Sequence, residues 1–304
     1  MRLLLVVGLA LALVPIARAA EPPLQGPTFV ETRVIHYVAH DGDVRSAWLL
    51  LPAGYHGQKI PLVISPHGRG VSDGANALLW SSLPGEGDFA VINPAGEGRR
   101  LHWYSWGYPG QIADLARMPE IARANGVNVD MKRIYAIGGS MGGQETLLLI
   151  ARYPHLLAGA VAFDPATDMA RRYRDFAALP GGKTLQRLCR IEVGGTPKQV
   201  PRAYEARSPD HFARQIADSG VPLQLYWSTK DRIIRDQLQE TNELAIEIRH
   251  DETHDRLWDF EGEWAHSAEM RPGRRLPRAL ARFGLLPWQD VPPLPPAPTP
   301  SLRV

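Results

Sequence analysis

The segment RIYAIGGSMGGQE (residues 133–145) carries the strongest structural signal in the chain. Its apolar run, Ile134 to Ile137, is typical of a buried strand, and a helical pattern begins directly after the glycines. Glycine loses the most backbone freedom on folding, so a cluster of glycines around one serine indicates a sharp turn or a close approach. The order of a strand, Gly138-x-Ser140-x-Gly142 and a helix is that of a nucleophile elbow, which holds the serine hydroxyl above the sheet. A phosphate-binding loop is the alternative, but the lysine that a P-loop needs does not follow.

The remaining pattern predicts an α/β protein. Short apolar runs with strand character alternate with helical segments, which is typical of a mostly parallel sheet with helices on both faces. We expect strands over 28–38, 46–52, 60–68, 89–94, 133–139, 157–165, 221–229 and 255–264, the first two forming an antiparallel start. We expect helices over 110–126, 142–154, 236–250 and 275–285. The segment 166–220 is too long for one crossover helix. We therefore predict a cap-like insertion over the carboxyl edge of the sheet, directly before the strand expected over 221–229.

The two ends of the chain differ from the middle. Residues 1–20 have an early arginine, an apolar run from Leu3 to Val14 and the small-residue pattern Ala17-Arg18-Ala19, which predicts a cleaved signal peptide and a secreted or periplasmic protein. An uncleaved membrane anchor is the alternative, but the apolar run is shorter than the roughly 20 residues of a spanning helix. One folded α/β domain is predicted over 21–286, and the proline-rich residues 287–304 form a tail to which we assign no structure.

Composition excludes several classes of function. With 44% hydrophobic and 22% charged residues, the chain is an ordinary globular protein. The formal net charge is +2, and loss of Arg2 and Arg18 with the signal peptide leaves zero, so nothing favours nucleic acid or anionic lipid as a partner. The single Cys189 cannot form an intramolecular disulfide and is expected to be buried. We expect a small-molecule or peptide substrate, and neither a metal nor an organic cofactor.

A serine nucleophile needs a base, and the base needs an acid that orients it. In this architecture the acid and then the histidine follow the serine, each in a loop after a strand. Asp231 comes directly after the strand expected over 221–229 and is the predicted acid. Asp236 is better explained as the N-cap of the next helix, and Asp164 as a turn residue before Pro165.

Two histidines compete for the role of the base. His254 would follow the last strand if that strand were AIEIRHDETH (245–254), but too few residues would then remain for the helix after Asp231. With a helix over 236–250 and a strand ending near Glu261, the loop GEWAHS presents His266 instead. We therefore predict His266 as the base.

Backbone amides are needed to stabilise the developing oxyanion. The amide of Met141, directly after the nucleophile, supplies one donor. The segment SPHGRG (65–70) supplies the other, from either Gly68 or Arg69, and His67 is expected to brace this loop.

An aromatic loop follows the strand expected over 89–94. It contains Trp103, Tyr104, Trp106 and Tyr108. Loops at the carboxyl ends of such strands border the active site, so these rings are candidates for substrate binding. Packing of the loop against the insertion is the alternative.

Together these motifs resemble a known family. HGRG, GGSMGG, STKDRII and GEWAHSAEM resemble an α/β-hydrolase, and GGSMGGQETLLL, AYEARSP and WSTKD are similar to the catalytic domain of prolyl-oligopeptidase-type serine hydrolases and related esterases. The resemblance covers roughly residues 30 to 286. Peptidases of that type usually carry a β-propeller ahead of this domain and some carry paired glutamates for a peptide amino terminus; only a short segment precedes HGRG here, and no such glutamate pair is evident.

The resemblance implies a serine hydrolase that cleaves an ester or amide bond through an acyl-enzyme, and the signal-peptide pattern predicts that it is exported. We expect an ester rather than a peptide substrate, because no gating domain is evident. A serine peptidase of the prolyl-oligopeptidase type is the alternative. A binding protein with the same fold and no catalytic activity is a further alternative. Loss of a triad residue would favour it, but every expected member of the triad is present.

Overall fold

The computed structural model describes residues 30–80, 82–251 and 255–294. The predicted signal peptide (residues 1–20), the competing histidine His254 and the last part of the proline-rich tail lie outside these ranges.

The described residues form an eight-stranded sheet with the order β1-β2-β4-β3-β5-β6-β7-β8. Its strands are β1 (Val30–Val38), β2 (Val44–Pro52), β3 (Ile60–Ile64), β4 (Ala90–Pro94), β5 (Val129–Gly139), β6 (Gly159–Phe163), β7 (Leu223–Ser228) and β8 (Leu257–Gly262). β2 pairs antiparallel with β1 and with β4, and every other pair is parallel. The prediction of a mostly parallel sheet with an antiparallel start is confirmed.

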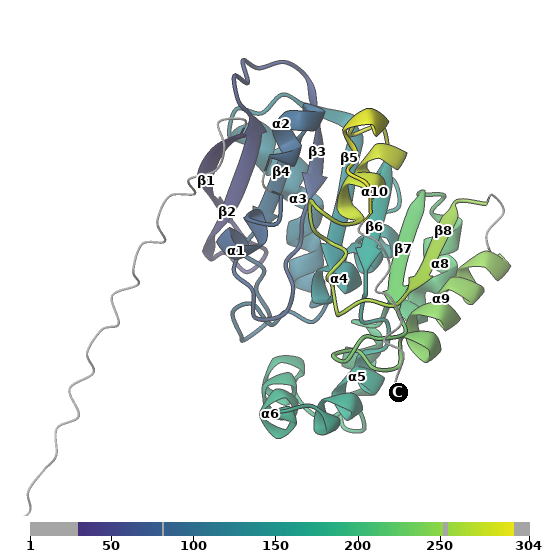
Figure 1. Ribbon diagram of the computed structural model, residues 1–304. Coiled ribbons are helices and arrows are strands. Elements are labelled where there is room, and N and C mark those ends of the chain that lie inside the picture. Colours follow the sequence, from purple (N-terminus) through teal and green to yellow (C-terminus); the bar gives the residue numbers. More distant parts are fainter. Residues whose placement is uncertain (1–29, 81, 252–254, 295–304) are drawn as a thin grey trace, which may run out of the picture.

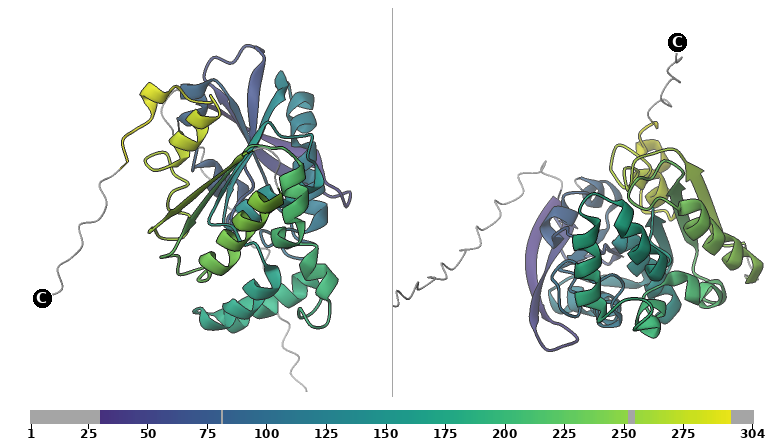
Figure 2. Two further views of the ribbon diagram at one scale, coloured as in Figure 1. Left: turned by 90° about the vertical axis from the view of Figure 1, so that its right-hand side faces the viewer. Right: turned by 90° about the horizontal axis from the view of Figure 1, so that it is seen from below.

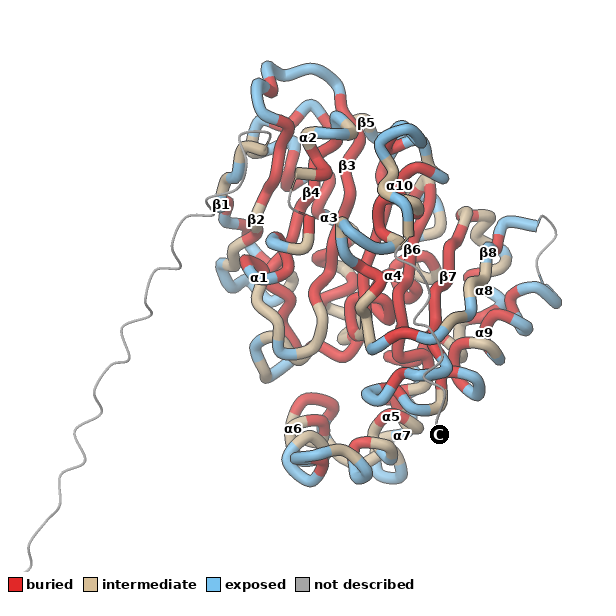
Figure 3. The backbone as a smooth tube through the Cα atoms, viewed as in Figure 1, coloured by how far each residue is buried: buried red, intermediate tan, exposed pale blue. Residues whose placement is uncertain are grey.

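Helices cover both faces of the sheet (Figures 1 and 2). One face packs against α3 (Pro109–Ala124), α4 (Met141–Arg152), α8 (Ala213–Asp218) and α9 (Gln237–Asp251), whose apolar side chains share a single core with the strands. The other face packs against α1 (Asp73–Ala77), α2 (Leu83–Gly87) and α10 (Leu276–Arg282) in a second core. Buried residues concentrate in the central strands, as expected for parallel strands covered on both faces (Figure 3).

A small helical layer extends beyond the carboxyl ends of β6 and β7 (Figure 1). It consists of α5 (Met169–Asp175), η1 (Phe176–Ala178), α6 (Gly182–Val193) and α7 (Pro201–Glu205), and we call residues 169–205 the cover. The insertion predicted over 166–220 also contains η2 (Pro209–Phe212) and α8. Because Ala213 and Ile216 of α8 belong to the first core, α8 is the crossover helix between β6 and β7 and not part of the cover.

The cover is fixed to the loop after β4 by a buried ion pair. Glu192 of α6 accepts hydrogen bonds from the backbone amides of Arg99 (2.6 Å), Arg100 (2.8 Å) and Leu101 (3.2 Å). Arg207 lies 3.2 Å from the same carboxylate, and the two side chains are 3% and 0% exposed. Arg207 also donates to the carbonyl oxygen of Ser105. One carboxylate and one guanidinium therefore connect segments that are about 90 to 100 residues apart in the sequence.

The structure also bears on the expectations for Cys189, for the proline-rich tail and for membrane-spanning helices. Cys189 is buried in the core of the cover, as predicted. The tail begins with structure that the sequence analysis did not assign: η3 (Trp288–Asp290), with the guanidinium of Arg282 6.0 Å from the Trp288 ring and Val291 packed on the second core. Among the helices of the described ranges, none combines the length and the apolar character that crossing a membrane requires.

The buried ion pair leads to a stability prediction. Glu192→Gln leaves the Arg207 guanidinium buried without its counter-charge, which we expect to lower the free energy of unfolding by about 3–5 kcal/mol. Urea denaturation followed by tryptophan fluorescence measures the change. Glu120→Gln is the matched control, because Glu120 pairs with Arg123 in solvent (side chains 63% and 52% exposed) and such pairs contribute little. Equal effects of the two substitutions would contradict a structural role for Glu192.

Candidate active site

Ser140 lies on a very tight turn between β5 and α4. Its backbone has φ 58° and ψ −122°, a conformation that residues other than glycine rarely adopt. A Cβ atom at Gly138 would lie 2.4 Å from the carbonyl oxygen of Gly142, and one at Gly142 would lie 2.2 Å from the carbonyl oxygen of Pro66. Both positions therefore require glycine, which is the physical reason for the Gly-x-Ser-x-Gly pattern.

Backbone hydrogen bonds hold the turn in place. The amide of Ser140 donates to the carbonyl oxygen of Phe163 at the end of β6 (2.8 Å), and the Ser140 carbonyl accepts from the Gln144 amide in α4 (3.0 Å). The serine is thus attached to the neighbouring strand on one side and to the helix on the other, so its position depends on two rigid elements.

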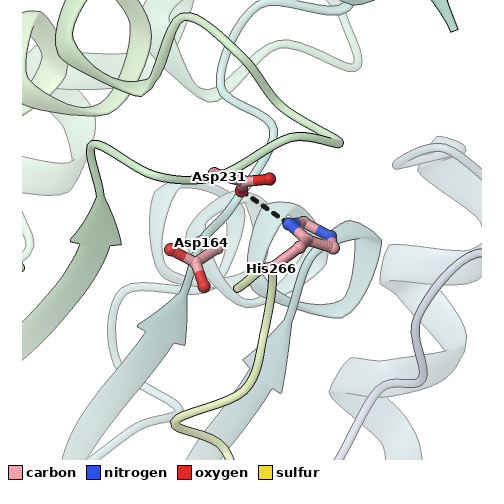
Figure 4. Close-up of side chains that lie close together, drawn as sticks. All are labelled: Asp164, Asp231 and His266. Atoms are coloured by element: carbon pink, nitrogen blue, oxygen red, sulfur yellow. Dashed lines mark hydrogen bonds and ion pairs between the residues drawn. The ribbon is translucent and has the colours of Figure 1, made fainter. Parts of the chain in front are cut away.

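The structure brings Asp231 and His266 into direct contact (Figure 4). The Nδ1 atom of His266 lies 2.6 Å from Oδ2 of Asp231, and their side chains are 15% and 0% exposed. Asp231 follows β7 and His266 follows β8, so each residue comes from the loop that the sequence analysis assigned to it. The contact fixes the histidine with Nδ1–H toward the carboxylate and Nε2 as the free nitrogen.

Asp231 is held by several donors besides the histidine. Its Oδ1 accepts from the amides of Ile233 (2.7 Å) and Ile234 (3.0 Å), and Gln237 Nε2 lies 3.3 Å from Oδ2. Burial by itself raises the pKa of Asp231, but the hydrogen bonds and charge of His266 and the two amides outweigh burial and hold the pKa below its usual value. The carboxylate is therefore ionised at neutral pH. Asp236, the competing acid, directly precedes α9, and its carbonyl oxygen accepts from the amides of Gln239 and Glu240.

Ser140 and His266 line one cavity of about 300 Å³. The Nε2 atom of His266 is buried there and has no hydrogen-bond partner among the described residues. The walls combine apolar side chains with residues of the loops after β3 and β8: Gly68, Arg69, Val71, Asn76, Leu79, Gly139, Ile233, Ser267, Met270 and Arg271. The free nitrogen of the histidine and the serine of the elbow thus border the same space.

Asp164 has a role that the sequence analysis did not foresee. It lies at the end of β6, fully buried, and accepts hydrogen bonds from Trp264 Nε1 (2.9 Å) and from the Ser267 amide (2.8 Å). These two donors flank His266 in the sequence, so Asp164 fixes the loop that carries the histidine. Figure 4 shows the Asp164 side chain near those of His266 and Asp231. Burial raises the pKa of Asp164 to about 7, although the charge of His266 opposes that shift. Asp164 does lie in the turn before Pro165, with φ 43°, but the sequence analysis did not predict that its carboxylate also holds the loop of His266.

Ser228, the last residue of β7, connects the two loops. Its hydroxyl donates to the carbonyl oxygen of Trp264 (2.7 Å) and accepts from the amides of Trp264 (2.8 Å) and Lys230 (3.0 Å). The loop of Asp231 and the loop of His266 are therefore tied to the same hydroxyl group. No motif marks Ser228, because its role depends on contacts between residues far apart in the sequence.

Asp164, Asp231 and His266 also form a group whose potential ligand atoms lie within 4.8 Å of one another. Both oxygens of Asp164 face the Trp264 N–H, and Oδ2 also accepts from the Ser267 amide. Asp231 is similarly surrounded by N–H donors. Because these donors occupy the lone pairs that a cation would need, the donor set fits a hydrogen-bond network rather than a metal site.

Of the residues expected to supply oxyanion donors, Gly68 and Arg69 line this cavity, and Met141 is not among its lining residues. Met141 is the first residue of α4, so its amide is one of those that a helix leaves without an intrahelical acceptor. Gly68 and Arg69 line the cavity from the loop after β3. His67 braces this loop, donating from Nδ1 to the Gly68 carbonyl (2.8 Å) and accepting at Nε2 from the Gly96 amide (2.9 Å). Burial lowers the pKa of His67, which favours its neutral form.

The four aromatic residues of the loop after β4 (Trp103, Tyr104, Trp106 and Tyr108) are not among the residues that line the cavity. Trp106 is 2% exposed and packs against Phe176 of the cover (ring centroids 5.9 Å apart), Tyr104 (5.3 Å) and Met141. Tyr108 lies beneath the Arg207 guanidinium. The structure thus gives Tyr104, Trp106 and Tyr108 a packing role, and Trp103 is not among the residues that line the cavity.

Comparison with known proteins supports this architecture. A search of curated proteins found an uncharacterised peptidase of Bacillus subtilis, YtmA, 26% identical over 156 residues, which are 51% of this chain and 56% of that protein. An esterase from the fungus Rhizomucor miehei superposes with a TM-score of 0.64 at 13% identity, over 86% of this chain and 84% of its own. A puromycin-hydrolysing peptidase of Mycobacterium tuberculosis superposes with a TM-score of 0.63 at 20% identity, over 89% of this chain and 41% of its own.

The chain therefore spans about half of its curated relative and less than half of that peptidase, but most of the esterase. The model of the prolyl oligopeptidase family matches residues 89–263, which is more than half of the chain. This protein, with an α/β-hydrolase fold, belongs to the prolyl oligopeptidase family of serine hydrolases.

Proposed function

We propose that the protein hydrolyses carboxylic esters through an acyl-enzyme on Ser140. The observation that carries the proposal is the 2.6 Å contact between Asp231 and His266 beside a cavity that Ser140 also lines. Asp231 holds the imidazole so that Nε2 faces the cavity. His266 takes the proton of Ser140 as the hydroxyl attacks the carbonyl carbon, and returns that proton to the leaving group. The amides of Met141 and of Gly68 or Arg69 stabilise the oxyanion.

The walls of the cavity favour an ester over a peptide with a free amino terminus. Val71, Leu79, Ile233 and Met270 offer apolar surface for an acyl or alcohol group. The ionisable wall residues of the described cavity, apart from His266, are Arg69 and Arg271, and no carboxylate is among them. A peptide ammonium group would therefore meet like charge instead of a partner. Cleavage of an amide bond is the alternative, since family members include peptidases.

We also propose that the protein is exported, on the strength of the apolar run and the small-residue site in residues 1–20. N-terminal sequencing of protein recovered from the periplasm or medium tests the proposal, with a mature terminus next to Ala20 expected. Recovery only from the cytoplasm with Met1 retained would contradict it.

Ser140→Ala tests the nucleophile. We expect the wild-type protein to react with a fluorophosphonate probe, giving one adduct by intact mass that peptide mapping places on Ser140. The variant should keep its fold by circular dichroism but lose labelling and ester hydrolysis. Ser267→Ala is a matched control, because Ser267 lines the same cavity but its hydroxyl has no assigned role. Labelling of Ser140→Ala would show that another residue is the nucleophile.

Substitutions of Asp231 and Asp164 test two different roles: Asp231 orients the imidazole of His266, and Asp164 supports the loop that carries it. Asp231→Asn presents the wrong tautomer to the histidine and should reduce kcat by about 10⁴-fold, as in other serine hydrolase triads. Asp164→Asn still accepts one N–H, so we expect a loss of roughly 10- to 100-fold, because the loop positions His266 less accurately. Steady-state kinetics and thermal melts of both variants provide the measurement. A folded Asp164→Asn protein that is less active than Asp231→Asn would make Asp164 the catalytic acid.

A further inference from the structure

The cavity beside Ser140 contains a cation that no neighbouring carboxylate neutralises. Arg69 follows Gly68 in the loop after β3 and lines the cavity together with Ser140 and His266. Its guanidinium carbon lies 5.6 Å from the centroid of the Phe176 ring in the cover. Within the described ranges Arg69 forms no ion pair, and burial lowers its pKa. The guanidinium is thus partly desolvated beside the nucleophile without a counter-charge.

A second guanidinium packs on the same ring. The Cζ atom of Arg172 in α5 lies 4.6 Å from the centroid of Phe176, and the residue is 3% exposed. Its Nη1 atom is buried and has no hydrogen-bond partner among the described residues. Arg69 and Arg172 repel each other electrostatically, which contributes, after burial, to a lowered pKa of Arg172. Two like charges therefore converge on one ring between the cover and the cavity.

The carboxyl groups near Arg172 do not form an ion pair with it. Glu240, Asp175 and Asp231 attract Arg172 electrostatically, but none of them lies within ion-pair distance of it in the described structure. Burial raises the pKa of Glu240 to about 8, so this group is mostly neutral at pH 7. An unpaired, desolvated cation is costly, and a ligand that supplies the missing charge recovers part of that cost.

We propose that the natural substrate is an ester that carries a carboxylate, which binds Arg69 while its apolar part contacts Val71, Leu79, Ile233 and Met270. The guanidinium of Arg172, which packs on the Phe176 ring, adds to the positive potential near the cavity. The exposed Arg271, which lines the cavity, adds to it as well. A guanidinium matches a carboxylate through two parallel N–H donors, and such charge-assisted hydrogen bonds are among the strongest in proteins. The inference rests on the proposed ester hydrolysis, since it names the chemistry of the substrate for the same site.

Matched ester pairs test the proposal on both sides of the scissile bond. Monophenyl adipate and phenyl hexanoate differ only in a carboxylate or methyl group at the end of the acyl chain. The meta-carboxyphenyl and meta-methylphenyl esters of butanoic acid differ in the same way on the alcohol side. We expect kcat/KM to favour the carboxylate ester of at least one pair by about tenfold or more, the factor for one charge-assisted hydrogen bond, and to lose part of that preference at high salt.

Arg69→Met should reduce the ratio of kcat/KM between carboxylate and neutral ester by roughly 10- to 100-fold, and Arg172→Met should reduce it less. Arg214→Met is the control, because Arg214 is an exposed residue of α8 (side chain 81% exposed) that pairs with Asp218. It removes the same charge away from the cavity and should leave the ratio unchanged.

The outcomes separate this inference from the proposed function. Turnover of neutral and carboxylate esters at similar rates, or a preference that Arg69→Met leaves intact, would overturn the carboxylate proposal while ester hydrolysis stands. Failure of every ester together with absence of fluorophosphonate labelling would overturn the proposed function instead. The preference of the unmodified enzyme is measured without any variant, so a misfolded Arg69→Met protein does not leave the question open.

Discussion

Gly142 approaches the carbonyl oxygen of Pro66 so closely that any side chain would displace one of them, since a Cβ atom would lie 2.2 Å away. This contact brings the start of α4 against the loop after β3. It thereby brings Met141, the first residue of α4, close to the loop that carries Gly68 and Arg69. Gly138 permits the turn itself. The position of Ser140 relative to the loop after β3 therefore depends on the absence of side chains at Gly138 and Gly142.

The other half of the site depends on polar contacts at the carboxyl edge of the sheet. Asp164 after β6 and Ser228 at the end of β7 bind the loop of His266 from two neighbouring strands. Asp231 then needs only to orient the ring. The cover is attached separately, through Glu192 and Arg207, to the loop after β4. The loops of Asp231 and His266 and the cover therefore have different polar anchors, although the cover also packs on Met141 through Trp106.

Much of this architecture could be predicted because its signals are local. The elbow is a contiguous pattern, and Asp231 and His266 follow strands that their apolar runs identify. Asp164, Ser228 and Glu192 could not be assigned in the same way, since their partners lie 103, 36 and about 92 residues away in the sequence. The role of the aromatic loop could not be predicted either, because it depends on a contact with a residue far away in the sequence. Its composition suits a substrate pocket as well as a packing surface, and only the position of Phe176 reveals that Trp106 packs on the cover.

The backbone of Ser140, with φ 58° and ψ −122°, has a thermodynamic consequence. Holding a residue that is not glycine in such a region costs on the order of 1–3 kcal/mol, which the surrounding sheet and helix must offset. Glycine at this position would relieve the strain, so Ser140 is held at a conformational cost in the folded state. If Ser140 is the nucleophile that we propose, selection for stability alone would disfavour the residue that activity requires.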